Sequence, residues 1–468
     1  MSIETLPWIS DQCPGVAVSR RSPLSVVPAL VRDPLQALPP EIYREPVVYS
    51  QVAGRRRILL ADPALIHEAL VRNADALNKG EDVRRALGPA LGRGLLTADG
   101  AHWRWQRQSV APAFRHEKLL GLLPSMIAAA EKTRERWLAP GAGASVGIGR
   151  EMMRTTFDII VDTMMSGPGE IDVARVERGI TDYLKPTGWV FALSILDLPD
   201  WLPYPGRRRA AAAAAYLRSS VTRMIAERRR NPDGREDLVA LLLAASDPES
   251  GRTMTDEEIA DNLLTFVTAG HETTALGLAW TFLLLARHPE QEARVVAEID
   301  AVTQGGPVRP EHIGQLAYAR QVFSEAMRLY PPAPIITRTA TRSFALGGFR
   351  VPEGAVVIVP IHAVHHHAAL WTDPARFDPE RFAPEPAKAR HRYAYLPFGA
   401  GPRICIGSAF ATMEAVAIMA VLLQAVRLRA RSDAMPDPMM KVTLRPRREA
   451  EMSVERRHPF QGAVTQMS

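Results

Sequence analysis

One cysteine near the C-terminal end of the chain lies in a stretch that constrains both the fold and the chemistry. Residues 398–407 read Phe-Gly-Ala-Gly-Pro-Arg-Ile-Cys-Ile-Gly, and an apolar, helix-like run follows. Glycines permit positive φ angles and let a backbone approach a flat cofactor closely. A nearby helix N-terminus and Arg403 favour the thiolate, which is the form of cysteine that binds metals. We therefore expect Cys405 to bind a metal centre; the alternative is a buried structural cysteine.

The same stretch closely resembles the haem-binding loop of the cytochrome P450 family. The resemblance implies that Cys405 is the axial ligand of haem b (iron protoporphyrin IX) and that Phe398, Arg403 and Gly407 contact this cofactor. A cysteine thiolate on haem iron favours O–O cleavage. Five motifs between about residues 100 and 414 follow the order of the family. They imply the cytochrome P450 fold, which is mainly α with a small β-rich lobe.

A second unusual stretch, Ala269-Gly270-His271-Glu272-Thr273-Thr274, lies within a long apolar helix expected over about residues 262–286. Glycine costs roughly 1 kcal/mol inside a helix, and threonine can bond to a preceding carbonyl and bend the axis. The stretch resembles the family's oxygen-activating helix, which implies that Glu272 relays protons and that Thr273 hydrogen-bonds the oxygen being activated. The alternative is a kinked core helix with a buried acid. We expect His271 beside the groove, not on iron.

Basic and aromatic residues elsewhere match positions that hold the haem propionates in this family. Trp103 and Arg107 lie four residues apart on an early helix. Arg338 and Arg403 match two further propionate-binding positions, and His102 could also reach a propionate. An arginine that points into an apolar cavity needs an anion, and a propionate is one. An exposed basic helix face is the alternative for the early helix.

Glu325, Arg328 and Arg381 resemble the buried charge triad that locks the cysteine loop in this family. The first two are three residues apart on one helix, a spacing that exposed ion pairs also use. If the triad is buried, removal of one partner leaves an uncompensated charge. We therefore expect these residues to be structural.

Two clusters of charged or titratable residues are interpreted as secondary features. The histidines at 362 and 365–367 could suggest a metal site, but the residues around them resemble the family's segment just before Arg381. The basic run at 388–392 is either a solvated loop or a docking patch for an acidic electron donor. Neither cluster changes the interpretation of Cys405.

The sequence predicts a single cytochrome P450 domain over residues 1–468. Short strands are expected at Val47-Val48-Tyr49 and Ile58-Leu59-Leu60, separated by Gly54 and a run of three arginines, in a β-containing lobe over about 40–65. A helical body follows over about 64–330. A Pro-rich and haem-loop region is expected over about 331–430, with the last helix over about 408–426.

Composition restricts the partners and the cellular compartment that we expect for the protein. The net charge of +6 is not accompanied by interleaved basic and aromatic residues, so we expect no nucleic-acid partner. Two cysteines, Cys13 and Cys405, cannot form a disulfide framework, which fits a reducing cytoplasm. Neither a signal peptide nor a transmembrane anchor is expected. We expect a cytoplasmic, bacterial-type, soluble monomer.

The resemblance implies a haem-dependent monooxygenase that inserts one atom of O₂ into a hydrophobic small molecule. Electrons from NAD(P)H would come through a separate ferredoxin and ferredoxin reductase, or a flavodoxin-type donor. The expected pocket is apolar, which favours a terpenoid, steroid or fatty acid, and no lone cation is expected to clamp a carboxylate. Besides Thr273, the expected pocket residues are Leu95, Leu96, Phe191, Ala269, Ala333, Ile335 and Ile336.

Two other functions are compatible with a haem–thiolate sequence of this kind. A haem–thiolate isomerase or peroxygenase would need no electron partner, but the pair Glu272 and Thr273 argues against it because such an enzyme has less need of a proton relay. A non-enzymatic haem sensor or binding protein would need an output domain, and the chain leaves little room for one.

Overall fold

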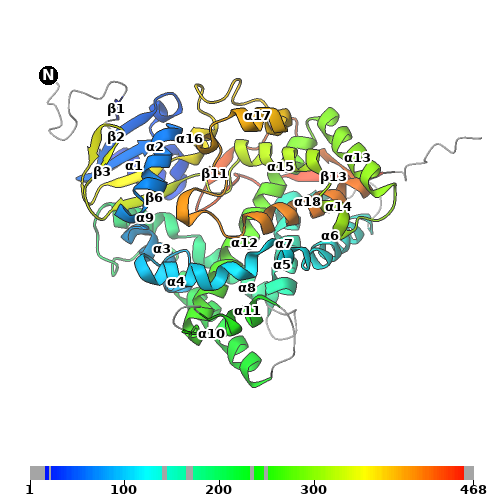
Figure 1. The fold of residues 1–468 in the computed structure, drawn as a ribbon, viewed down its shortest axis with the longest axis horizontal. Helices are drawn as coiled ribbons and strands as arrows, with labels where there is room; N and C mark the ends of the chain where they lie inside the picture. The colour runs from blue at the N-terminus through cyan, green and yellow to red at the C-terminus, as the bar shows by residue number, and fades with distance from the viewer. Residues whose placement is uncertain are drawn as a thin grey trace, which may run out of the picture.

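The computed structural model describes residues 16–19, 23–139, 145–164, 172–231, 237–246 and 251–457. Cys13 lies outside these residues. The described chain is broadly triangular, with the largest sheet at one corner and helices forming most of the rest; strands of the smaller sheets, such as β11 (Pro438–Met440) and β13 (Glu451–Arg456), lie away from that corner (Figure 1). The mainly α fold with a small β-rich lobe is therefore confirmed.

The α-helices are α1 (Pro23–Arg32), α2 (Pro63–His67), α3 (Glu81–Leu91), α4 (Gly100–Val110), α5 (His116–Leu120), α6 (Leu123–Leu138), α7 (Ile148–Met164), α8 (Val173–Leu184), α9 (Thr187–Ile195), α10 (Arg207–Arg230), α11 (Leu238–Ala244), α12 (Asp256–Leu285), α13 (Pro289–Thr303), α14 (Pro310–Ile313), α15 (Ala317–Leu329), α16 (Ile361–His365), α17 (Pro384–Ala389) and α18 (Ser408–Ala425).

The strands are β1 (Val16–Ser19), β2 (Val47–Val52), β3 (Arg55–Leu60), β4 (Leu77–Asn78), β5 (Ser145–Gly147), β6 (Ile336–Ala340), β7 (Phe344–Leu346), β8 (Phe349–Val351), β9 (Val356–Val359), β10 (Val426–Ala430), β11 (Pro438–Met440), β12 (Leu444–Pro446) and β13 (Glu451–Arg456). The largest sheet has the order β1-β2-β3-β9-β6-β4, so strands from the first 80 residues pair with strands that follow the helical body.

The hairpin of β2 and β3 differs from the prediction in one respect. The three arginines at 55–57 belong to β3 and not to the turn. The turn consists of Ala53 and Gly54, which both have positive φ angles of 50° and 78°, as a tight two-residue hairpin turn requires. Side chains alternate across a strand. Arg55 and Arg57 therefore share one face of the sheet.

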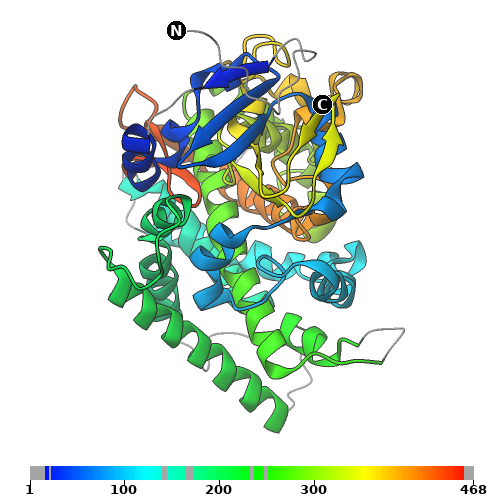
Figure 2. The ribbon, with the colours of Figure 1, turned by 90° about the vertical axis from the view of Figure 1, so that its left-hand side faces the viewer.

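Helix α12 forms the centre of the helical body. Its N-terminus is fixed by a capping box in which the Thr255 hydroxyl accepts from the Glu258 backbone N–H and the Glu258 carboxylate accepts from the Thr255 N–H. This signal explains why the helix begins earlier than the predicted residue 262. Figure 2 shows α12 passing through the middle of the molecule below the strands.

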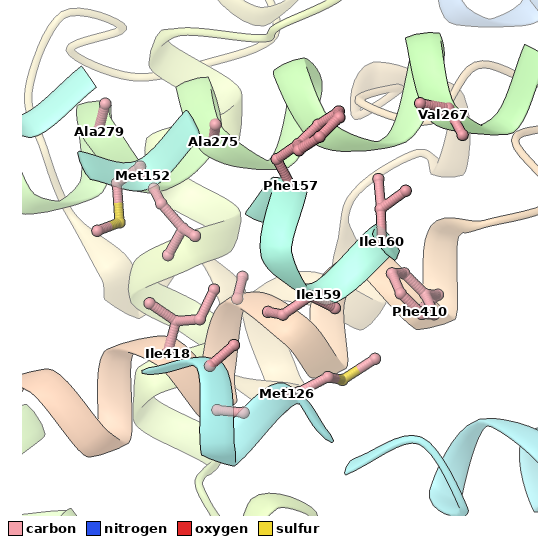
Figure 3. Packing of buried hydrophobic residues seen from close by; sticks show 14 of the residues in the cluster. Met126, Met152, Phe157, Ile159, Ile160, Val267, Ala275, Ala279, Phe410 and Ile418 are labelled. Carbon is pink, nitrogen blue, oxygen red and sulfur yellow. The ribbon is translucent and has the colours of Figure 1, made fainter. Parts of the chain in front are cut away.

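The core between the helices is apolar and closely packed. Residues of α6, α7, α12 and α18 meet there, as Figure 3 shows for Met126, Phe157, Val267 and Ile418. Helix α18 ends one residue before the predicted boundary. Within the described residues, α18 is also the one helix whose length and composition would suit a membrane span, and 61% of it is buried inside the structure.

The β11–β12 hairpin lies against the first helix although more than 400 residues separate them in sequence. The Met440 backbone N–H donates to the Asp33 carboxylate at 3.0 Å, and the Lys441 ammonium donates to the Arg32 carbonyl at 2.7 Å. Arg447 forms an ion pair with Asp33 at 3.3 Å. These contacts close one side of the interior.

Three of the histidines named in the sequence analysis, His362, His365 and His366, pack inside the frame of the fold. Within the described part of the chain, no group of three or more metal-ligating side chains is gathered. His365 accepts from the Leu396 backbone N–H at 2.8 Å through Nε2, so its Nδ1 donates to the Arg328 carbonyl at 3.1 Å. This ring joins α15 to the segment that leads to Cys405. His362 and His366 stack with ring centroids 4.2 Å apart.

We predict that stability falls as the pH drops below about 6.5. Burial lowers the pKa of His362, His365 and His366, to about 4 for His366. The unfolded chain then takes up protons that the folded chain does not, so the stabilisation is present above about pH 6.5 and is lost towards the folded pKa. For one such histidine the loss is about 2 kcal/mol between pH 6.5 and about pH 5.

Denaturant unfolding at stepped pH values measures this loss. His366→Phe keeps an aromatic ring on His362 and removes one titrating group, so its free energy of unfolding should depend less steeply on pH. An identical dependence in parent and variant would contradict the assignment.

Candidate functional site

A cavity of about 560 Å³ lies between α12, the sheet and the loop that carries Cys405. Helix α4 and the β11–β12 hairpin complete its walls. All of the expected pocket residues line it: Leu95, Leu96, Phe191, Ala269, Thr273, Ala333, Ile335 and Ile336. The Cys405 side chain lines the same cavity.

The cysteine loop is held in an unusual backbone conformation. The Cys405 backbone N–H donates to the Phe398 carbonyl at 2.8 Å, which closes the loop before α18 begins. Gly399 and Gly401 have φ angles of 75° and 70°. A Cβ atom at Gly401 would lie 2.1 Å from the Leu70 carbonyl oxygen, so only glycine fits. The expectation of positive φ holds at these two positions.

The electrostatics around the thiol differ from the sequence prediction. Burial raises the pKa of Cys405, and the Gly407 backbone N–H, Arg107 and Lys79 oppose this rise. Arg403 is not among the groups that act on it. Its guanidinium instead pairs with Asp99 at 2.5 Å. The protein alone therefore favours the thiol, and a bound metal would supply the remaining driving force for deprotonation.

The central part of α12 presents a narrow polar face to the cavity. Between residues 259 and 285, the residues that are not buried are Thr268, Ala269, Gly270 and Thr273, and all four line the cavity. The helix continues through them without a break. The Thr273 hydroxyl donates to the Ala269 carbonyl at 2.7 Å. This is the local back-bond that was expected of threonine in a helix.

Glu272 is buried and already has two polar partners. The Thr443 hydroxyl donates to its carboxylate at 2.5 Å, and the Arg445 guanidinium forms an ion pair with it. Both partners lie on or beside the β11–β12 hairpin, and sequence reasoning did not identify them. His271 is buried on another side of α12, where it contacts Phe157 and the Val267 carbonyl.

One end of the cavity carries more positive charge than the protein neutralises. Four basic side chains line it: Lys79, Arg107, Arg338 and Arg403. Of these four side chains, only Arg403 forms an ion pair with an acid of the described residues. Burial and, to a smaller extent, the Arg403 charge lower the pKa of Arg338 to about 10. Burial also lowers the pKa of Lys79 strongly, as do the Arg338 and Arg403 charges.

These residues fit a haem with its two propionates. Buried cations without partners require anions, and Trp103 adds an aromatic wall under the Arg403 guanidinium, 4.3 Å from its ring centroid. Lys79 was missed in the sequence because it follows a two-residue strand and belongs to no motif. His102 does not reach the cavity. Its ring hydrogen-bonds Gln106 and stacks on Trp105.

The three residues of the expected charge triad come together behind the loop. Arg328 and Glu325 are both fully buried and form two hydrogen bonds of 2.7 Å. Arg381 lies 3.4 Å from the same carboxylate. Arg328 also donates to the carbonyls of His365 and Pro374 at 2.8 and 2.7 Å. The charges therefore join α15 to the segment that leads towards Cys405.

The sequence matches the cytochrome P450 family profile over residues 41–454. Two Streptomyces melanosporofaciens proteins, cyclooctatin synthase and cyclooctat-9-en-7-ol 5-monooxygenase, are each 35% identical over 90% of this chain, and cover 91% and 90% of their own lengths. Pentalenene oxygenase of Streptomyces avermitilis is 32% identical over 85% of this chain and 88% of its own length.

A solved structure agrees with this assignment. The crystal structure of the cytochrome P450DA heme domain has a TM-score of 0.79 and 28% identity, and the match covers 88% of this chain and 90% of that one. The chain belongs to the cytochrome P450 family. It is a haem-dependent monooxygenase with the cytochrome P450 fold.

We predict that Glu325→Ala lowers the free energy of unfolding by about 3–5 kcal/mol, because Arg328 would remain buried without its partner. Urea unfolding of the purified protein measures the change. Glu380→Ala is the matched control, since it removes an exposed ion pair with Arg294 at the residue directly before Arg381. The control should change by less than about 1 kcal/mol. Equal effects of the two substitutions would contradict a structural role for Glu325.

Proposed function

We propose that this monooxygenase oxidises an apolar terpenoid-type molecule, with Cys405 as the axial ligand of its haem. The observation that carries this proposal is a single apolar cavity that contains the Cys405 side chain, the Thr273 face of α12 and the aliphatic pocket residues. Three similar proteins are named for cyclooctatin, cyclooctat-9-en-7-ol and pentalenene. The haem, when bound, would supply the activation of dioxygen and the transfer of one oxygen atom to the substrate.

The protein's own residues would hold the haem and exclude water from the substrate. Arg107, Arg338, Arg403 and Lys79 would hold the propionates, with Trp103 beside them. Phe398 and Gly407 would contact the porphyrin next to Cys405. Apolar side chains would exclude water from the reacting end of the substrate.

The acid and the alcohol of α12 would handle protons at the α12 wall of the cavity. The Thr273 hydroxyl already donates to the Ala269 carbonyl, so its oxygen lone pairs can accept a further hydrogen bond from the cavity. The Glu272 carboxylate accepts from Thr443 and Arg445 in this structure. It would carry protons towards Thr273 when those partners move or exchange with water.

Electrons would come from NAD(P)H through separate proteins, such as a ferredoxin with its reductase or a flavodoxin-type donor. The basic run at 388–392 offers a smaller docking patch than its sequence suggests. Arg390 stacks over Phe382 at 4.5 Å and Trp371 at 4.8 Å and donates to the Arg381 carbonyl. Lys388, His391 and Arg392 are exposed and would meet an acidic partner.

We predict that the reduced, CO-bound protein gives a strongly red-shifted Soret band, as a thiolate-bound haem does, and that Cys405→Ala abolishes it. Cys405→His should move the band to the ordinary histidine–haem position. Circular dichroism of each variant checks that the fold is kept. A red-shifted band in Cys405→Ala would refute the assignment of the ligand.

We predict that Thr273→Ala lowers the product formed per NAD(P)H consumed by about tenfold, since positioned proton transfer contributes about 100-fold or more to a rate. Thr281→Ala is the matched control, because Thr281 makes the same back-bond, to the Gly277 carbonyl at 2.7 Å, in the buried part of α12. Coupling of product to NAD(P)H should be kept in the control. Equal coupling in Thr273→Ala and the parent would exclude this role.

A further inference from the structure

Arg57 is a basic residue on the cavity wall that the haem does not account for. Strand β3 alternates so that Arg55, Arg57 and Leu59 all line the cavity. Arg57 is half-buried and has no ion pair or hydrogen bond from its side chain among the described residues. A cation in this position is not fully hydrated and makes no direct ion pair with an acid of the described residues, although the Asp82 charge acts on it from a distance.

Arg55, which lies on the same face of β3, differs from Arg57 because it forms ion pairs. Arg55 pairs with Asp82 at 3.0 Å and with Asp197 at 3.3 Å. The Asp82 carboxylate also accepts a hydrogen bond from the Ser194 hydroxyl. Asp82 is therefore engaged by other groups. Burial lowers the pKa of Arg57 to about 10, and the Asp82 charge only partly opposes this shift.

Arg57 lies apart from the cations at the haem end. Arg338 is on β6 and Arg57 on β3, and β9 lies between them. Adjacent strands are about 4.8 Å apart, so the two backbones are about 10 Å from each other. Lys79 follows β4, which is one strand further away. The charges that act on Arg57 are Asp82 and Arg55, whereas Lys79 and Arg338 respond to Arg403 and Asp99.

A hydroxyl group accompanies Arg57. In the pairing of β2 with β3, Ser50 lies directly opposite Arg57, and both line the cavity. Cross-strand neighbours of this kind have Cβ atoms about 5 Å apart, so one small anion can contact both side chains. The Ser50 hydroxyl has no hydrogen bond among the described residues. Leu59, Val356 and Ile358 surround the pair with apolar surface on the same face of the sheet.

We propose that Arg57 and Ser50 bind the carboxylate of an amphiphilic substrate and that oxidation takes place towards its opposite, apolar end. The substrate class is then a hydrophobic carboxylic acid, such as a terpenoid acid or a fatty acid. The inference rests on the proposed monooxygenase function and sharpens its substrate. The sequence analysis expected no cation to be placed for a carboxylate and assigned the three arginines to a turn, whereas the structure places Arg57 in β3 on the cavity wall.

Isothermal titration of the haem-loaded enzyme with abietic acid and dodecanoic acid, each beside its methyl ester, tests the proposal. The acids should bind about tenfold to hundredfold more tightly than the esters, as expected for a charge-assisted hydrogen bond. In Arg57→Gln this ratio should fall to near one, and Arg57→Lys should restore part of it. Arg56→Gln is the control, because Arg56 is exposed on the other face of β3 and its variant should keep the parent ratio.

Equal binding of acid and ester by the parent, or an unchanged ratio in Arg57→Gln, would overturn the proposal. The reduced CO spectrum of each variant shows separately whether the haem site is intact. Failure of the proposed function would appear in the parent as the absence of that band or of any oxidation of apolar molecules. Failure of the carboxylate site would leave both in place and abolish only the preference for the acid.

Discussion

The buried pair of Glu325 and Arg328 is the interaction on which the position of the Cys405 loop depends. Two opposite charges are removed from water completely, which is stabilising only when every donor and acceptor is used. Arg328 meets that condition, because its guanidinium reaches Glu325 and the carbonyls of His365, Pro374 and Arg376. One side chain thus joins a rigid helix to an irregular segment that has no regular secondary structure to hold it.

In the candidate cofactor pocket the backbone is tightly held, whereas the charges of the side chains are not balanced by the protein. Gly401 is fixed by contact with a neighbouring carbonyl, and the Cys405 backbone is fixed by the Phe398 carbonyl. The charges around them are not balanced by the protein alone, since burial raises the pKa of Cys405 while three nearby cations have no acid partner among the described residues. A dianionic, iron-bearing ligand would give the cations their counter-charges and would bind the deprotonated Cys405. Its binding should therefore release the thiol proton and stabilise the fold.

The sequence predicted those parts of the site whose residues are close together in the chain or lie on one helix face. Trp103 and Arg107 reach the cavity together because residues four apart share a helix face. His102 is rotated by about 100° from Trp103 and so contacts Gln106 instead. Lys79 and Arg57 could not be placed, because strand register and chain topology decide which way they point.

The contacts between Asp33 and the β11–β12 hairpin have a consequence for folding. The bond from Met440 to Asp33 joins residues 407 positions apart. Such a contact closes a very long loop, and the entropy of that closure opposes it until the intervening chain has folded. The hairpin that covers the cavity also supplies the partners of Glu272. Glu272 should therefore acquire its native partners at a late stage of folding, after the helical core has formed.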